Sequence, residues 1–290
     1  MGIINTYLMA TMAAIFWGAN FNLAKPVVAE MGPYVAGASR YLLAAAIMIL
    51  ITQVMRESTP LKHLRTYLVL GVVGVFGFNL FFFLGMETTS AVNGALIMAL
   101  NPLLTAILAY LILRDIPSRQ QLIAFPVGVG GVALVVLGAG AAHLNVSTGD
   151  IYICIANVSW AFYNVLVRKL MPKNVSGPAN TAGVMTAGAI ALCIAAIIKG
   201  DTFIVPTLPT SISLIIMTVG GGVLAYLFWN ASIARLGPSK AAIFMNLVPV
   251  TSMVIATIEG LPPNHAQLLG ALLVIGAVTF SSAFTSSTST

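Results

Sequence analysis

The side chains best suited to bind a small solute lie deep inside apolar stretches of the sequence. Asn79, Asn101 and Tyr163 are the polar candidates farthest from the ends of these stretches. Amide and phenol groups can hydrogen-bond an ammonium or a carboxylate group, and a polar side chain deep in a bilayer usually faces a cavity or another helix. We therefore take these three residues as the leading candidates for a solute cavity.

Other candidates share a helical face with these residues or lie within one turn of another polar residue. Aromatic rings and methionine would give the cavity a soft apolar wall for a variable side chain. An alternative is that each asparagine joins two helices, worth about 0.6 kcal/mol on average, and that the aromatic residues anchor the chain at the membrane surface. The further predicted cavity residues are Trp17, Asn20, Phe78, Phe82, Met98, Trp160, Asn164, Tyr226 and Asn246.

Two prolines occupy matching places in the two halves of the chain. Pro102 follows ALIMALN, and Pro249 follows AIFMNLV. Each proline removes a backbone hydrogen bond and bends its helix, which leaves carbonyl groups free to meet a solute. We predict a hinge or gate at these positions; a static kink that improves packing is the alternative.

Charged side chains are almost absent from the middle of the apolar stretches. Arg40 is the exception, and we expect it to extend toward the membrane surface; pairing with Glu30, or with a solute carboxylate near the outer mouth, are the alternatives. Every acidic residue lies near the end of a stretch or in a loop. Proton-driven exporters usually have an acid or a histidine within the membrane. The sequence thus disfavours obligatory proton antiport, with Glu87, near the end of its stretch, as the alternative coupling site.

The sequence contains none of the common motifs for catalysis, nucleotide binding or metal binding. A phosphate-binding loop, a G-x-S-x-G nucleophile turn, an H-E-x-x-H pair and a cysteine–histidine metal spacing are all missing. Cys154 and Cys193 lie in apolar stretches, and we expect them to be small core residues without a disulfide. We predict a protein that is not an enzyme and needs no cofactor or metal.

The elements that must position the candidate side chains are membrane-spanning helices. Hydrophobic residues make up 59% of the 290-residue chain and charged residues only 7%, against about 25% charged in soluble domains, so lipid must solvate most of the surface. Ten stretches approach the roughly 20 apolar residues that a helix needs to cross a membrane. They span residues 3–24, 34–54, 67–86, 92–113, 120–138, 151–167, 178–198, 211–231, 241–258 and 266–284.

The basic residues of the connecting loops predict the orientation in the membrane. Loops on the side of the N-terminus hold most of the lysines and arginines, whereas Lys25 and Lys199 lie on the opposite side. The positive-inside rule therefore places both termini in the cytoplasm, and it explains the basic excess without nucleic acid. We predict a multi-pass protein of the bacterial inner membrane.

The two halves of the chain also resemble each other. Ala13, Trp17, Leu23 and Lys25 recur as Ala156, Trp160, Leu166 and Arg168, and two later blocks recur at nearly the same spacing. A repeat of five helices must insert in opposite orientations in its two copies, and transporters of this plan bind solute between the repeats near the midplane. We predict an all-α membrane protein of ten transmembrane helices in two inverted five-helix repeats, residues 1–142 and 143–286, with a disordered tail at 287–290.

Four short blocks carry a resemblance to a known family. FWGANF at 16–21 and SWAFYN at 159–164 open the two halves, and ALIMALNP at 95–102 and AIFMNLVP at 242–249 complete the pattern. Together they resemble the EamA-type branch of the drug/metabolite transporter superfamily, and most of all bacterial amino-acid exporters of the YddG kind. The resemblance implies ten helices, inverted repeats, cytoplasmic termini and a central cavity.

The leading hypothesis is an exporter of amino acids, including aromatic and other neutral ones, and of related small metabolites, working by alternating access. Its expected partners are the solute and the lipid bilayer, with no nucleic acid and no obligate protein partner. An exporter of another metabolite or drug class is one alternative. A channel is another, but the sequence has neither a filter-like loop nor a ring of like charges at depth. A carrier of phosphate esters would need deep basic residues, and only Arg40 approaches that.

Overall fold

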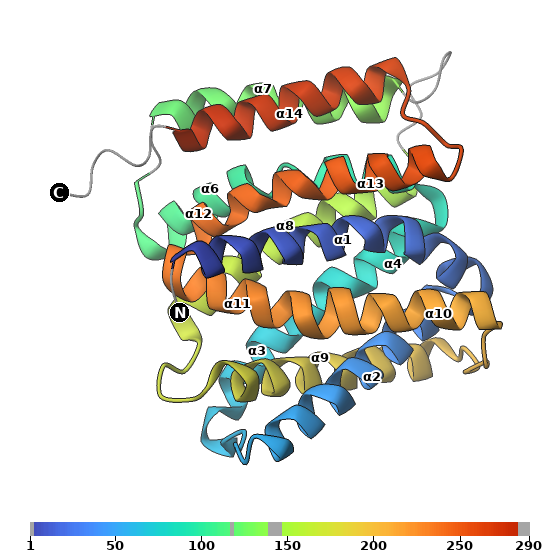
Figure 1. Cartoon of the computed structure of the whole chain (residues 1–290), viewed down its shortest axis with the longest axis vertical. Helices are drawn as coiled ribbons and strands as arrows, with labels where there is room; N and C mark the ends of the chain where they lie inside the picture. The colour runs from blue at the N-terminus through green and yellow to red at the C-terminus, as the bar shows by residue number, and fades with distance from the viewer. Residues whose placement is uncertain (1–2, 117–118, 139–146, 284–290) are drawn as a thin grey trace.

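The computed structural model describes residues 3–116, 119–138 and 147–283, and every regular element in these ranges is helical (Figure 1). α1 begins and α14 ends at the same end of the bundle. The predicted tail and the boundary between the halves, at residue 142, lie outside the described residues. The elements are α1 (Ile3–Met31), α2 (Pro33–Val54), η1 (Leu61–His63), α3 (Leu64–Leu70), η2 (Gly71–Gly77), α4 (Phe78–Thr88), α5 (Ala91–Met98), α6 (Asn101–Leu113), α7 (Arg119–Gly138), α8 (Thr148–Leu170), α9 (Gly177–Lys199), α10 (Leu208–Ile216), η3 (Met217–Leu224), α11 (Ala225–Leu236), α12 (Pro238–Ala242), η4 (Ile243–Asn246), α13 (Leu247–Ile258) and α14 (His265–Ala283).

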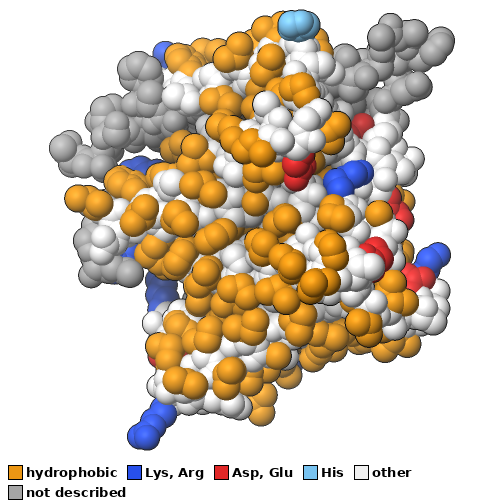
Figure 2. Space-filling model, turned by 45° about the vertical axis from the view of Figure 1, so that its right-hand side comes forward, with side chains coloured by type: hydrophobic (Ala, Val, Ile, Leu, Met, Phe, Trp, Pro, Cys, Tyr) orange, Lys and Arg blue, Asp and Glu red, His pale blue; other side chains and the backbone are white. Residues whose placement is uncertain are grey.

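Seven helical segments within the described residues are long and apolar enough to cross a membrane. α1, α7 and α14 take the places of the other three predicted spans, so the total of ten stays a prediction. Figure 2 shows a face on which hydrophobic side chains cover a broad central and lower area, while charged side chains lie mostly along the left side and in the right-hand part, as expected of a surface in contact with lipid. The seven segments are Pro33–Val54, Leu61–Thr88, Ala91–Leu113, Thr148–Leu170, Gly177–Lys199, Leu208–Leu236 and Pro238–Ile258.

Helices of the two halves pack on one another in matching pairs. α4 packs on α8, and α11 packs on α1, which is the same contact with the halves exchanged. α2 packs on α9, and α7 packs on α14; these two pairs form the opposite edges of the bundle in Figure 1. Two copies of one five-helix unit would produce this pattern, and the inverted insertion of the copies remains a prediction.

Two cations that match between the halves bind the ends of matching helices. Lys25 Nζ donates to the carbonyl oxygens of Met86 and Thr89 at 2.8 and 3.0 Å, at the end of α4. Arg168 Nη1 donates to the carbonyl oxygen of Ala234 at 3.4 Å, near the end of α11. A cation at a helix C-terminus satisfies carbonyls that lack helical partners. Lys25 lies within α1, which continues to Met31 instead of ending at the predicted residue 24.

Two spans depart from the regular α-helix that the sequence predicts. Their middle turns, η2 and η3, are π-helical and occupy equivalent places in the two halves. Both turns are rich in glycine: a Cβ atom at Gly74 would lie 2.0 Å from the Tyr163 ring, and one at Gly221 would lie 2.2 Å from the Asn20 amide. Glycine therefore lets neighbouring side chains reach the backbone, and π turns of this kind are frequent at functional sites.

Candidate functional site

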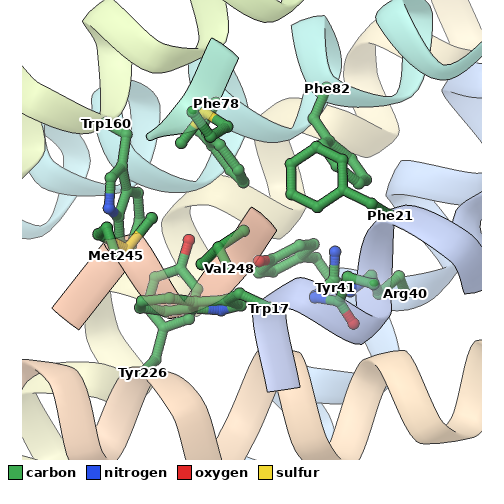
Figure 3. Close-up of a pocket in the computed structure, with 12 residues that line it drawn as sticks. Trp17, Phe21, Arg40, Tyr41, Phe78, Phe82, Trp160, Tyr226, Met245 and Val248 are labelled. Carbon is green, nitrogen blue, oxygen red and sulfur yellow. The ribbon is translucent and has the colours of Figure 1, made fainter. Parts of the chain in front are cut away.

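A small cavity lies inside the bundle, between helices of both halves (Figure 3). Its volume is about 20 Å³, which leaves room for about one water molecule. An amino acid does not fit this space, so a solute can enter only when the surrounding helices move apart. The lining residues are Trp17, Asn20, Phe21, Arg40, Tyr41, Phe78, Phe82, Met98, Trp160, Tyr226, Met245 and Val248.

Tryptophan and tyrosine rings from both halves form one wall of the cavity. The Trp17 ring meets Trp160 edge-on at 5.1 Å between centroids and Trp229 at 5.0 Å. Trp160 in turn meets Tyr226 edge-on at 5.4 Å. Edge-to-face pairs are favoured by about 0.5–1.5 kcal/mol each. The chain has 3 tryptophans, so all of them lie in or against this wall.

Phenylalanine rings from the first half form a second part of the wall. Phe78 and Phe82 of α4 stack with centroids 5.7 Å apart, and Phe21 of α1 meets Phe82 edge-on at 5.1 Å. Figure 3 shows these rings facing the space across from Tyr226 and Trp17. The cavity is therefore predominantly aromatic, as many small-molecule pockets are.

The π-helical turns fix the orientation of two of the lining rings. Trp17 Nε1 donates to the carbonyl oxygen of Gly221 in η3 at 2.8 Å, and Tyr226 Oη donates to that of Gly74 in η2 at 3.1 Å. Each bond joins one half of the chain to the other. A buried hydrogen bond of this kind adds about 1 kcal/mol and also sets the direction of the ring.

The predicted hinge prolines each lie one helical turn after a methionine of the cavity. α5 ends at Met98 and α6 begins before Pro102, while a 3₁₀ turn, η4, comes before Pro249 in α13. Because proline has no N–H, the carbonyls of Met98 and Met245 have no α-helical donor. Both breaks therefore lie beside the cavity, and a hinge or gate role for the prolines stays a prediction.

Arg40 lies in the cavity wall, and the prediction that it extends to the membrane surface is wrong. Its side chain is 2% exposed. Nε donates to the carbonyl oxygen of Met217 and Nη1 donates to Asn79 Oδ1, each at 3.3 Å, and the guanidinium lies 5.2 Å from the centroid of the Tyr41 ring. A backbone carbonyl and an amide inside the bundle thus replace water as acceptors.

The structure separates the predicted cavity residues into those that line the cavity and those that do not. Trp17, Asn20, Phe78, Phe82, Met98, Trp160 and Tyr226 line it. The remaining candidates are buried but lie outside the lining: Asn79, Asn101, Tyr163, Asn164 and Asn246.

Asn101 and Asn164 belong to a hydrogen-bonded cluster with Asn157, Thr105 and Trp229, which we call the asparagine network. Asn101 Nδ2 donates to Asn157 Oδ1 at 2.8 Å, and Asn164 Nδ2 donates to Asn101 Oδ1 at 3.0 Å. Thr105 Oγ1 also donates to Asn101 Oδ1, at 3.1 Å, and Trp229 Nε1 donates to Asn164 Oδ1 at 2.9 Å. Asn157 Nδ2 reaches a backbone carbonyl at 2.8 Å. Each amide is paired at both its oxygen and its nitrogen, so the network joins α6, α8 and α11.

The other predicted residues outside the lining have separate partners. Tyr163 Oη donates to Asn230 Oδ1 at 3.0 Å, and Asn230 Nδ2 donates to Thr181 Oγ1 at 3.2 Å. Asn79 Nδ2 donates to a carbonyl oxygen of η2 at 2.8 Å while its Oδ1 accepts from Arg40. Asn246 Oδ1 is buried without a hydrogen-bond partner.

Sequence reasoning did not select five lining residues. Met245 matches Met98 in the repeat, and Arg40 is a cation within a predicted span, so both carried a usable signal. Phe21, Tyr41 and Val248 look like any other apolar or aromatic residue in a membrane helix. Only the packing of the two halves distinguishes them.

Comparison with known sequences settles the family. The sequence model of the EamA-like transporter family matches the chain twice, at residues 4–137 and 147–283. The chain belongs to the EamA-like transporter family. Each of the matched segments contains one set of the paired helices described above, so the EamA unit occurs once in each half.

Two relatives are similar to the chain in sequence over nearly its whole length, and one solved structure is similar in fold. The uncharacterized transporter YyaM of Bacillus subtilis (strain 168) is 40% identical over 280 residues, which cover 94% of this chain and 92% of YyaM. A probable amino-acid metabolite efflux pump of Salmonella typhimurium (strain LT2) is 25% identical over 282 residues, covering 93% and 92% of the two chains. A crystal structure at 19% identity superposes with a TM-score of 0.73 over 96% of each chain, and it supports the fold alone.

The EamA family is a family of transporters and not of enzymes, and the chain is accordingly a multi-pass membrane transporter of small metabolites. No cluster of candidate metal ligands occurs in the part of the chain that the structure describes. The aromatic cavity between the halves is therefore the candidate solute site.

Proposed function

We propose that this EamA-family protein exports neutral amino acids, including aromatic ones, and related small metabolites by alternating access. The observation that carries the proposal is the cavity itself. Its walls come from both halves, and rings such as Trp17, Trp160 and Phe78 can pack against an apolar side chain. The side-chain oxygen of Asn20, which also lines the cavity, can accept a hydrogen bond from an ammonium group.

The size of the cavity supports alternating access over a channel. About 20 Å³ is too little for continuous passage of a solute. A much wider hollow of about 530 Å³ lies at the end of the bundle predicted to face outward, where Glu30, Tyr34, Glu87 and Lys199 contribute to its lining. A second hollow of about 410 Å³, lined in part by Gln53, Leu61 and Tyr67, lies toward the opposite end. A nearly closed centre between wider hollows suits a carrier that must change shape to release its solute.

The relative in Salmonella typhimurium gives modest support for the solute class. Its printed description is a probable amino-acid metabolite efflux pump, and its 25% identity extends over 93% of this chain. Export of amino acids by the present chain is our proposal from this likeness together with the chemistry of the cavity wall.

Counterflow in liposomes tests the proposal. Purified protein is reconstituted, the vesicles are loaded with one unlabelled amino acid at a time, and uptake of the labelled form is followed at equal pH on both sides. We expect internal phenylalanine or another neutral amino acid to accelerate uptake, because a carrier exchanges solute through a shared site. Failure of every amino acid to give counterflow would refute the solute class. Uptake that internal solute never accelerates would indicate a channel.

A further inference from the structure

Arg40 is a buried charge whose protein partners are all neutral. Its two hydrogen-bond acceptors are a backbone carbonyl and the amide of Asn79. No carboxylate contacts it among the described residues, and the cavity lining contains no acidic residue. A guanidinium group carries a positive charge in proteins, and a buried charge is normally paired with an opposite one.

Aromatic rings compensate this charge only in part. The guanidinium carbon lies 5.2 Å from the centroid of Tyr41 and 6.0 Å from that of Phe83. Rings at these distances attract a cation through their quadrupole, yet they cannot take up its hydrogen bonds. Nη2 forms none within the described residues, where the bonds of Arg40 come from Nε and Nη1.

Two further donors of the same cavity lack acceptors. Nε1 of Trp160 and the hydroxyl of Tyr41 are buried without a hydrogen bond of normal geometry, the Tyr41 hydroxyl lying near that of Tyr226, and both residues line the cavity with Arg40. Figure 3 shows Tyr41 beside Arg40 and Trp160 across the cavity from them. Buried polar groups are rarely left unpaired in a resting protein, so this cavity has an excess of donors over acceptors. Its natural complement is an acceptor that bears negative charge.

We propose that Arg40 binds the carboxylate of the transported solute, so that the solute class is amphipathic monocarboxylates such as apolar amino acids. The Tyr41 hydroxyl donates a second bond to the carboxylate. The apolar remainder of the solute lies among Phe21, Phe78 and Phe82, and Trp160 Nε1 meets any further acceptor on it. Amines that lack a carboxylate are excluded, because they would bring a second positive charge next to the guanidinium. The inference rests on the transport function proposed above and adds the group by which the solute is selected.

Binding of a solute to this site can be measured by the intrinsic fluorescence of the protein. All 3 tryptophans of the chain lie in or against the aromatic wall, so intrinsic tryptophan emission follows occupancy without a label. Phenylalanine and phenylalaninamide form a matched pair of probes, because they share the ring and the amine and differ at the carboxylate. Both are titrated against purified protein in chloride-free sulfate buffer, and both are then tested for counterflow in liposomes.

We expect the parental protein to bind phenylalanine at least about tenfold more tightly than its amide, as loss of a charge-assisted pair implies. Arg40→Gln should raise the half-saturation concentration for phenylalanine about tenfold and bring the two probes to similar values. Arg40→Lys should restore part of the preference. Arg168→Gln is the matched control, because Arg168 also donates to a backbone carbonyl but lies away from the cavity; it should keep the full preference.

Several results would overturn the inference. Equal binding and transport of phenylalanine and its amide by the parental protein would do so, and this comparison needs no variant to fold. A preference that survives in a folded Arg40→Gln protein would show that Arg40 serves structure alone. Binding that requires added chloride would assign the charge to a resident chloride ion. If no amino acid is bound or transported at all, the proposed function itself fails; if amino acids are transported without preference for the carboxylate, only the role of Arg40 fails.

Discussion

The asparagine network and the cavity are neighbouring polar regions that differ in how their groups are paired. In the network, Asn101, Asn157 and Asn164 pair their side-chain amides with one another, with Trp229 or with the backbone. In the cavity, Arg40 has only neutral partners among the described residues, where the Trp160 indole N–H has none. A set of hydrogen bonds in which every donor and acceptor is paired stabilises a fold but leaves no group free to bind a solute. Unpaired donors can still bind one.

The contrast shows how depth in the membrane misleads a search for binding residues. Asn101 is as deep as any candidate, and it is fully buried, but its neighbours already supply its partners. Asn20 is nearer the end of its predicted stretch, yet it lines the cavity and makes no side-chain hydrogen bond within the described residues. Unused hydrogen-bonding capacity is therefore a better guide to a site than distance from the helix ends.

The largest expected effect tests the backbone that supports both regions. Gly74→Ala would put a methyl group 2.0 Å from the Tyr163 ring, and overpacking typically costs about 1–3 kcal/mol, with the upper end expected for so close an approach. We expect little folded protein, measured as monodisperse yield after detergent extraction. Gly130→Ala is the control, because a Cβ atom there has nothing within 4 Å; its yield should equal that of the parent. Normal yield of Gly74→Ala would mean that η2 is not held as tightly as the structure indicates.

The next prediction compares an asparagine of each region. Asn101→Ala removes a donor and an acceptor from the network and leaves buried partners unpaired, so we expect a loss of about 2 kcal/mol in stability. The affinity for solute of the protein that still folds should not change. Asn20→Ala should do the opposite, with unchanged thermal stability and weaker counterflow. Thermal unfolding and counterflow on the same preparations check both, and a reversal of the two patterns would contradict the assignment.

Two tryptophan-to-phenylalanine substitutions compare the asparagine network with the cavity again, each by deleting a single indole N–H. Trp229→Phe deletes the donor to Asn164 Oδ1, and we expect a loss of about 1 kcal/mol in stability with unchanged affinity. Trp160→Phe deletes an indole N–H that has no partner, so stability should hold while solute affinity falls. Equal loss of stability in both variants would show that the Trp160 N–H has a partner in the fold.

The smallest expected effect concerns proton coupling. Neither region contains an acidic residue or a histidine, and Glu87 lines the wide hollow at the end of the bundle instead. We expect counterflow of a neutral amino acid to proceed at equal pH on both sides, and Glu87→Gln to leave it intact, because no acidic or histidine side chain lines the site. A strict need for a pH gradient that is lost in Glu87→Gln would make that carboxylate the proton site.

Much of the fold follows from the sequence because its signals are local or repeated. Long apolar stretches predict helices, and seven of the ten expected spans meet the length and composition of a membrane helix among the described residues. The matched prolines mark the two breaks beside the cavity. The π-helical turns η2 and η3 could not be read in this way, because they depend on side chains of distant helices that bind their carbonyls.

The residues of the site were harder to predict from the sequence, because the partners of a buried polar group come from distant helices. Trp17, Trp160 and Met98 were expected at the cavity and line it. Arg40 was expected at the surface, since a charge in a span is costly unless partners exist, and its partners Asn79 and Met217 come from helices far along the chain. Whether a polar group is already satisfied is a property of the packed bundle, and no single stretch of sequence records it.

The location of the solute site is tested most directly by cysteine protection during transport. Met98→Cys, in a protein whose natural cysteines Cys154 and Cys193 are alanine, places one thiol in the cavity wall, and Thr105→Cys places one in the asparagine network. The rate of reaction with a small thiol reagent is measured with and without phenylalanine. We predict that phenylalanine slows the reaction of the residue at 98 and does not affect that at 105. Protection at 105 with none at 98 would place the solute in the asparagine network and contradict the assignment of the aromatic cavity.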